Sequence, residues 1–204
     1  MKLATVSPIV FHIPKLCGAQ LEAGPIIQQI APGSASCDAG ATECRTASQA
    51  APFIVQSMDA YQMHTVNEIA AVLSLMAFES VDFKYKHNVY PGRPGQGTAN
   101  MQMANYNLLY AKSLDDVKDK VADIDSVDGL SDDKLNEILS LVTPDEHNFG
   151  SGPWFLATQC GGEVRESLKK DIDAGFEAYM GCVGVTVTDE RRAYLTRAKA
   201  AFGL

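Results

Sequence analysis

The sequence lacks the features that would place it at once among membrane or nucleic-acid-binding proteins. None of its 204 residues belongs to a run of about 18 apolar residues, the length that a membrane-spanning helix requires. Basic residues are few, 17 Lys and Arg against 25 Asp and Glu, and no basic patch is interleaved with aromatic residues. We therefore expect neither a nucleic acid nor a membrane as a partner.

Cysteine is also scarce, and none of its spacings fits a zinc site such as C-x-x-C. Cys37 and Cys44 lie seven residues apart and Cys160 and Cys182 twenty-two apart, so these four are predicted to form two local disulfides. Cys17 is left over in an apolar N-terminal stretch. If that stretch is a secretory signal, its removal leaves an even number of cysteines, which predicts a secreted, extracellular protein. A cytosolic protein with buried thiols is the alternative.

The composition allows one sizeable core, with 46% hydrophobic residues and a formal net charge of −8. Residues 18–36 are rich in Gly, Ala, Pro and Ser without a clear period, so residues 1–36 are predicted to be a signal or propeptide-like arm. Residues 37–204 are predicted to form one domain of mainly α class. We expect it to be a monomer without a cofactor or a metal.

Helix signals run through this domain. Apolar spacing predicts a helix over residues 46–60, and the Thr65 to Glu68 capping box starts a central helix that ends near residues 80–82. Further helices are predicted from residue 105, from the caps at residues 113 and 131, and over residues 153–159, 163–180 and 188–202. Residues 83–104 are the candidate for a small irregular β-hairpin that folds over the end of the central helix.

Glu79 is the main candidate for chemistry. It lies on the same stripe of the central helix as Val72, Met76 and Phe83, so its carboxyl should be partly desolvated. Desolvation raises the pKa of a carboxylic acid, as a general acid near neutral pH requires. A glycosidic oxygen is a poor leaving group until it is protonated, so this placement suggests glycan cleavage.

Two short motifs carry a resemblance to a known family. Phe78-Glu79-Ser80, followed by Gly97-Thr98-Ala99-Asn100-Met101-Gln102, resembles the goose-type lysozyme and lytic transglycosylase branch of the lysozyme-like superfamily. Through FES…PGRPGQGT…MQ and WFLATQC…CVGVTVTDERRAY, residues 37–204 also resemble small secreted fungal lysozyme-like proteins and muramidases. The resemblance implies a lysozyme-like α+β fold and a hydrolase that cleaves the β-1,4 linkages of peptidoglycan. A chitinase-type hydrolase, a lytic transglycosylase and a non-catalytic secreted glycan-binding or effector-like module are the alternatives.

Other residues near Glu79 complete the predicted site. Asp82 could hold a nucleophilic water or raise the pKa of Glu79, and otherwise is a solvated carboxylate. The expected substrate-binding residues follow Glu79 in the sequence: an amide of the Met-Gln element, an asparagine of the hairpin and three tyrosines that could stack on sugar faces or pack in the core with a wet hydroxyl. They are Gln102, Asn88, Tyr85, Tyr90 and Tyr106.

Overall fold

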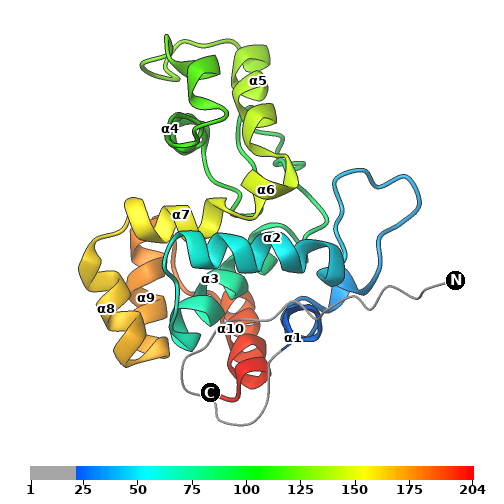
Figure 1. Cartoon of the computed structure of the whole chain (residues 1–204), viewed down its shortest axis with the longest axis vertical. Helices are drawn as coiled ribbons and strands as arrows, with labels where there is room; N and C mark the ends of the chain where they lie inside the picture. Colours follow the sequence, from blue (N-terminus) through cyan, green and yellow to red (C-terminus); the bar gives the residue numbers. More distant parts are fainter. Residues whose placement is uncertain (1–21) are drawn as a thin grey trace, which may run out of the picture.

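The computed structural model describes residues 22–204, and the helix that ends at Glu79 has more buried residues than any other helix of this range (Figure 1). This helix, α3 (Val66–Glu79), buries every residue from Glu68 to Ala77. The Thr65 hydroxyl accepts a hydrogen bond from the Glu68 backbone N–H and donates one to the Glu68 carboxylate. The predicted N-terminal cap of the central helix is therefore confirmed.

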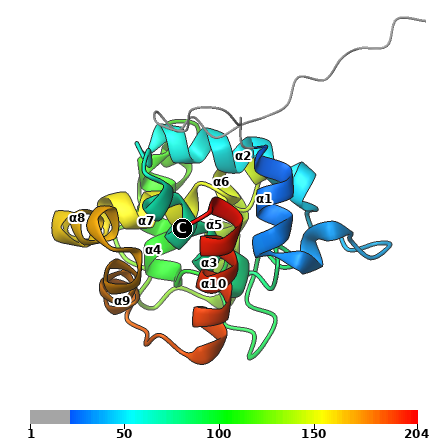
Figure 2. The same ribbon diagram turned by 90° about the horizontal axis from the view of Figure 1, so that it is seen from below.

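A larger core surrounds α3. It is built from α1 (Ala23–Ile30), α2 (Ala47–Ala60), α7 (Ser151–Thr158), α8 (Gly162–Lys170), α9 (Ile172–Val183) and α10 (Asp189–Phe202). Figure 2 shows α10 running alongside α3 near the middle of the molecule. The first turn of α10 thereby comes close to the last turn of α3.

A smaller core lies above the first in Figure 1. It contains α4 (Ala104–Ser113), the 3-10 helix η2 (Lys118–Val121) and α5 (Asp132–Val142), packed on Trp154 and Phe155 of α7. The short α6 (Asp145–Asn148) connects α5 to α7. Lys86 binds the Asp145 carboxylate at 2.6 Å, which ties the segment after α3 to this connection.

The mainly helical class is confirmed, but the predicted β-hairpin is wrong. Within residues 22–204 there is no strand, and isolated bridges join Gly97 to His87 and to Gln102. The Pro and Gly cluster of residues 91–97 cannot propagate a ladder, and Thr98 and Met101 have positive φ angles of 67° and 47°. The segment therefore forms an irregular loop.

Two helix boundaries also differ from the prediction. The single helix expected over residues 163–180 is two helices, because the Asp171 carboxylate accepts hydrogen bonds from the Asp173 and Ala174 backbone N–H groups and starts α9. The helix expected from the cap at residue 113 forms only the short η2.

Part of the segment predicted to be a signal or propeptide-like arm packs on the larger core. Ile26, Ile27 and Ile30 of α1 are at most 6% exposed, because their spacing forms one apolar face against the larger core. The 3-10 helix η1 (Pro32–Ala35) follows directly. Residues 1–21, with Cys17 and the expected secretory signal, lie outside the described residues.

Both predicted disulfides are present. Cys37–Cys44 closes the loop after η1, and Cys160–Cys182 joins the end of α7 to α9. Across residues 22–204, the helices are too short or too polar to cross a membrane.

Candidate functional site

Glu79 lies in the wall of a cavity at the end of α3. The cavity has a volume of about 280 Å³, and its other lining residues come from the loop that follows α3: Val81, Tyr85, His87, Asn88, Val89, Tyr90 and Met101. The Glu79 side chain is 19% exposed. Burial raises the pKa of Glu79 above its usual value, and the hydrogen bond and positive charge of Arg191 oppose this rise.

Arg191 comes from the first turn of α10, 112 residues away in the sequence. Its Nη2 donates to the Glu79 carboxylate at 3.0 Å, and its guanidinium lies 4.6 Å from the centre of the Phe78 ring. Sequence reasoning missed this residue, because its partner is distant in the chain. One feature of the sequence could have pointed to Arg191. A cation in the first turn of a helix is unfavourable with respect to the helix dipole, which suggests that it has an anionic partner elsewhere.

Two buried polar groups accompany this pair. Within residues 22–204, the Tyr179 hydroxyl and the Arg191 Nε are buried without a hydrogen-bond partner. Burial raises the pKa of Tyr179, and the charge of Glu79 adds to that rise. The raised pKa keeps the Tyr179 hydroxyl protonated near Glu79.

A left-handed turn follows Glu79 and shapes the cavity. Val81, Asp82 and Phe83 have φ angles of 52°, 59° and 65°. Such a conformation costs roughly 1–2 kcal/mol for each residue other than glycine, so other contacts must offset it. The Phe83 N–H donates to the Ser80 hydroxyl at 2.9 Å, and the Tyr85 N–H donates to the Ser80 carbonyl at 3.2 Å. The turn thereby places Tyr85 against the same cavity as Glu79.

Asp82 does not join Glu79 in the cavity. Its carboxylate accepts a hydrogen bond from the Gly33 backbone N–H and another from the Tyr194 hydroxyl, both at 2.8 Å. Burial and the bond to Asp82 raise the pKa of Tyr194 to about 12. Asp82 therefore ties the turn to η1 and α10, facing away from the site.

The structure brings together some of the predicted substrate-binding residues and separates others. Tyr85, Asn88 and Tyr90 line the cavity with Glu79, and Tyr90 is 91% exposed. Gln102 is buried, where its amide donates to Asn107 at 2.9 Å. Tyr106 packs on Phe155 in the smaller core. The apolar lining by Val81, Val89 and Met101 had not been predicted.

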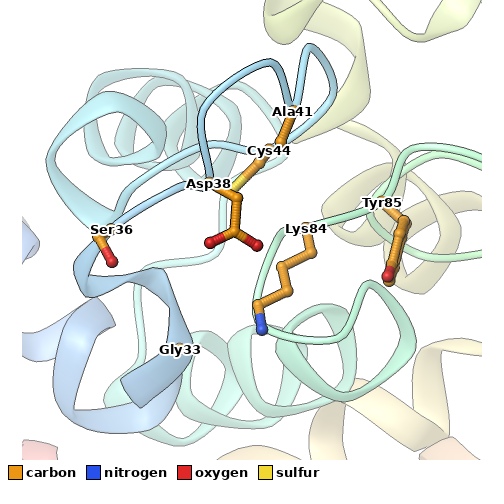
Figure 3. Close-up of a pocket in the computed structure, with 7 residues that line it drawn as sticks. All are labelled: Gly33, Ser36, Asp38, Ala41, Cys44, Lys84 and Tyr85. Atoms are coloured by element: carbon orange, nitrogen blue, oxygen red, sulfur yellow. The ribbon is translucent and has the colours of Figure 1, made fainter.

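Tyr85 also lines a second cavity (Figure 3). Its volume is about 170 Å³, and it is lined by Gly33, Ser36, Asp38, Ala41, Cys44, Lys84 and Tyr85. No sequence motif pointed to it, because its walls come from the loop after η1 and from the turn after α3.

The residues present do not fit a metal centre. Within the described part of the chain, no three His, Cys, Asp or Glu side chains gather around a common point. His87 is bonded to Glu43 at 2.7 Å and His147 to Asp116 at 3.0 Å, so two imidazoles already have carboxylate partners in separate places.

Comparison with known proteins gives a different relationship from the one that the motifs suggested. The chain is 59% identical over 157 residues to a bifunctional dioxygenase (DOX)-epoxy alcohol synthase (EAS) of Fusarium oxysporum. The match covers 76% of the chain but only 12% of that relative, so the chain spans about an eighth of the relative's length. No family model matches the chain, and no solved structure matches it.

This similarity overturns the lysozyme-like resemblance. The predictions of a glycoside hydrolase or muramidase, of a chitinase-type, transglycosylase or glycan-binding alternative, and of a peptidoglycan or chitin-like partner are wrong, because the relative is a dioxygenase and synthase. Packing accounts for the Gly-x-x-x-Met-Gln element. A Cβ at Gly97 would collide with the Lys86 carbonyl, and the side-chain amide of Gln102 donates its hydrogen bond to Asn107. The motif is therefore explained without a sugar ligand.

Proposed function

We propose that this chain is a segment of a protein of the dioxygenase–epoxy alcohol synthase type, and that its Glu79 cavity binds an epoxy alcohol. The 59% identity to such a protein supports the first part. The observation that carries the second part is a desolvated carboxyl in the wall of a cavity that Val81, Val89 and Met101 also line. The segment contributes a product-binding cleft to an oxidoreductase.

The ligand's chemistry matches the cavity. An epoxy alcohol has a carbon skeleton, an oxirane oxygen that only accepts hydrogen bonds, and a hydroxyl that both donates and accepts. A protonated Glu79 carboxyl donates one hydrogen bond and can still accept one from Arg191. It can therefore donate to the oxirane oxygen while Arg191 holds its other oxygen. Val89 and Tyr90 offer apolar surface for the carbon chain.

The oxygen-insertion step has no assigned residues in this segment. The histidines within residues 22–204 do not supply the grouped ligands that an oxygen-activating metal requires. We also propose that the protein passes through an oxidising, secretory compartment, since the disulfides Cys37–Cys44 and Cys160–Cys182 would form there.

A titration of the ¹⁵N-labelled chain with trans-2,3-epoxyhexan-1-ol tests the binding proposal. We expect amide shifts at Val81, Asn88 and Val89, and binding about fivefold tighter than that of hexan-1-ol, because the oxirane oxygen adds about one hydrogen bond. Glu79→Leu removes the donor and should abolish this preference, whereas Glu79→Gln keeps a donor and should retain it.

Glu177→Leu is the matched control, because this glutamate is 67% exposed on α9 and does not line the cavity. It should bind both probes as the wild type does. Equal binding of the two probes to the wild type, or an undiminished preference in a folded Glu79→Leu variant, would contradict the proposal.

A further inference from the structure

The two cavities share Tyr85. One is also lined by Glu79 and apolar side chains, and the other by Ser36, Asp38 and Lys84. We infer that the cavities are two subsites of one cleft, and that the second subsite takes a neutral, hydroxyl-bearing end group of the ligand. This inference rests on the proposed function and adds the ligand's second end.

The walls of the second subsite are fastened to the turn that carries the first. The Cys37–Cys44 disulfide closes the loop that supplies Asp38. The Arg45 N–H after this loop donates to the Phe83 carbonyl at 3.0 Å, and the Glu43 carboxylate accepts a hydrogen bond from the Lys86 N–H at 2.9 Å. Both bonds join the loop to the residues flanking Lys84 and Tyr85.

The η1 side is fastened to the same turn. The Gly33 N–H is bound to Asp82, and a Cβ at position 33 would approach the Asp82 carboxylate to 2.7 Å. A glycine is therefore needed for this close approach. The second cavity has a defined shape because covalent and hydrogen bonds fix its walls.

The charges in the second subsite point to a neutral group. Figure 3 shows the Asp38 carboxylate and the Lys84 amine directed into the space between η1 and the turn. Over the described residues, neither side chain forms an ion pair or a hydrogen bond, and no other charged side chain lines the cavity. An anion drawn to Lys84 would also meet Asp38, and a cation drawn to Asp38 would meet Lys84.

A hydroxyl satisfies both groups. It donates a hydrogen bond to a carboxylate and accepts one from an ammonium group. An alcohol between Asp38 and Lys84 can therefore bind both groups and is repelled by neither. Tyr85, which is 40% exposed and lines both cavities, offers its ring to the carbon chain that would link the subsites. The assigned ligand is thus elongated, with an oxirane at Glu79 and a hydroxylated, uncharged end at Asp38 and Lys84.

Three probes with the same six-carbon skeleton test this inference: 1,2-hexanediol, hexanoate and hexylammonium, titrated into the ¹⁵N-labelled chain. We expect hexanediol to shift the amides of Asp38, Lys84 and Val89 together. The two charged probes should bind about fivefold more weakly, because each opposes one wall charge and forgoes one hydrogen bond.

Charge-neutralising variants separate the roles of the two walls. Asp38→Asn should let hexanoate bind as tightly as hexanediol, and Lys84→Gln should do the same for hexylammonium. Asp123→Asn, an exposed change near η2, is the matched control and should leave the three affinities as they are.

Hexanoate bound to the wild type as tightly as hexanediol, or hexanediol shifts confined to one cavity, would overturn the inference. The proposed function fails separately. It fails alone if hexanediol spans both cavities with this discrimination but the epoxy alcohol binds no tighter than hexan-1-ol. The inference fails alone if the epoxy alcohol binds at Glu79 but hexanediol never reaches Asp38 and Lys84.

Discussion

Replacing Asp82 with alanine should strongly destabilise the protein, although Asp82 is not one of the residues that line the Glu79 cavity. The variant loses the two 2.8 Å hydrogen bonds that the carboxylate accepts from Gly33 and Tyr194. A hydrogen bond to a charged group contributes about 1.5–3 kcal/mol, and the lower value applies to this partly exposed site. The two bonds at about 1.5 kcal/mol each give an expected loss of about 3 kcal/mol of unfolding free energy. The same loss removes the contacts that hold the left-handed turn in place.

Urea unfolding followed by circular dichroism measures this loss. Asp82→Asn keeps one acceptor oxygen and should lose about half as much. Asp123→Ala changes an exposed side chain that forms no hydrogen bond or ion pair within residues 22–204, and should lose less than about 0.5 kcal/mol. In ¹⁵N spectra of Asp82→Ala, the amides of Gly33 and Tyr85 should both shift. A loss under about 1 kcal/mol, matched by Asp123→Ala, would refute the role of Asp82 as the anchor of the turn.

Three further predictions concern strain, charge and covalent linkage. Val81→Gly should leave unfolding free energy unchanged or raise it by up to about 1 kcal/mol, because glycine relieves the positive φ of 52°; a thermal melt that shows a clear loss would argue against strain at this position. Burial raises the pKa of Glu79 above 4.5, so its contribution to stability is present below pH 4.5 and is lost as the pH rises through the folded-state pKa. Unfolding free energies of the wild type and Glu79→Gln should therefore diverge with rising pH, the wild type losing more, and parallel pH curves would rule this out. Replacing both Cys160 and Cys182 by alanine opens a linkage over a separation of 22 residues and should cost about 3 kcal/mol in urea unfolding, whereas a loss near zero would show that the linkage adds no stability.

Local signals made most of the helices predictable. Thr65 and Ser131 each cap a helix where the sequence predicts the cap, because capping depends on residues three positions apart. The grouping of Glu79 with Tyr85 and Tyr90 was also accessible, since all three lie within twelve residues. Short-range chemistry therefore explains the frame and half of the cavity.

Long-range contacts account for what the sequence concealed. Arg191 reaches Glu79, and Tyr194 reaches Asp82, each across 112 residues, and only the packing of α10 on α3 brings them together. Gly33 belongs to a segment whose composition resembles a loose arm, yet its N–H holds the turn. The lysozyme-like motifs misled because buried Gln102 and close-packed Gly97 have structural roles that a short pattern does not distinguish from ligand binding.

The central claim, that a protonated Glu79 donates a hydrogen bond to an epoxy alcohol, is tested most directly by the pH dependence of affinity. The Kd of trans-2,3-epoxyhexan-1-ol should be constant below the pKa of Glu79 and should rise about fivefold, to a plateau, as the pH passes through that pKa, because only the protonated carboxyl donates the hydrogen bond. For Glu79→Gln the Kd should stay constant across the same range, since the amide donates at every pH. A wild-type Kd independent of pH, or a rise that persists in Glu79→Gln, would contradict the account.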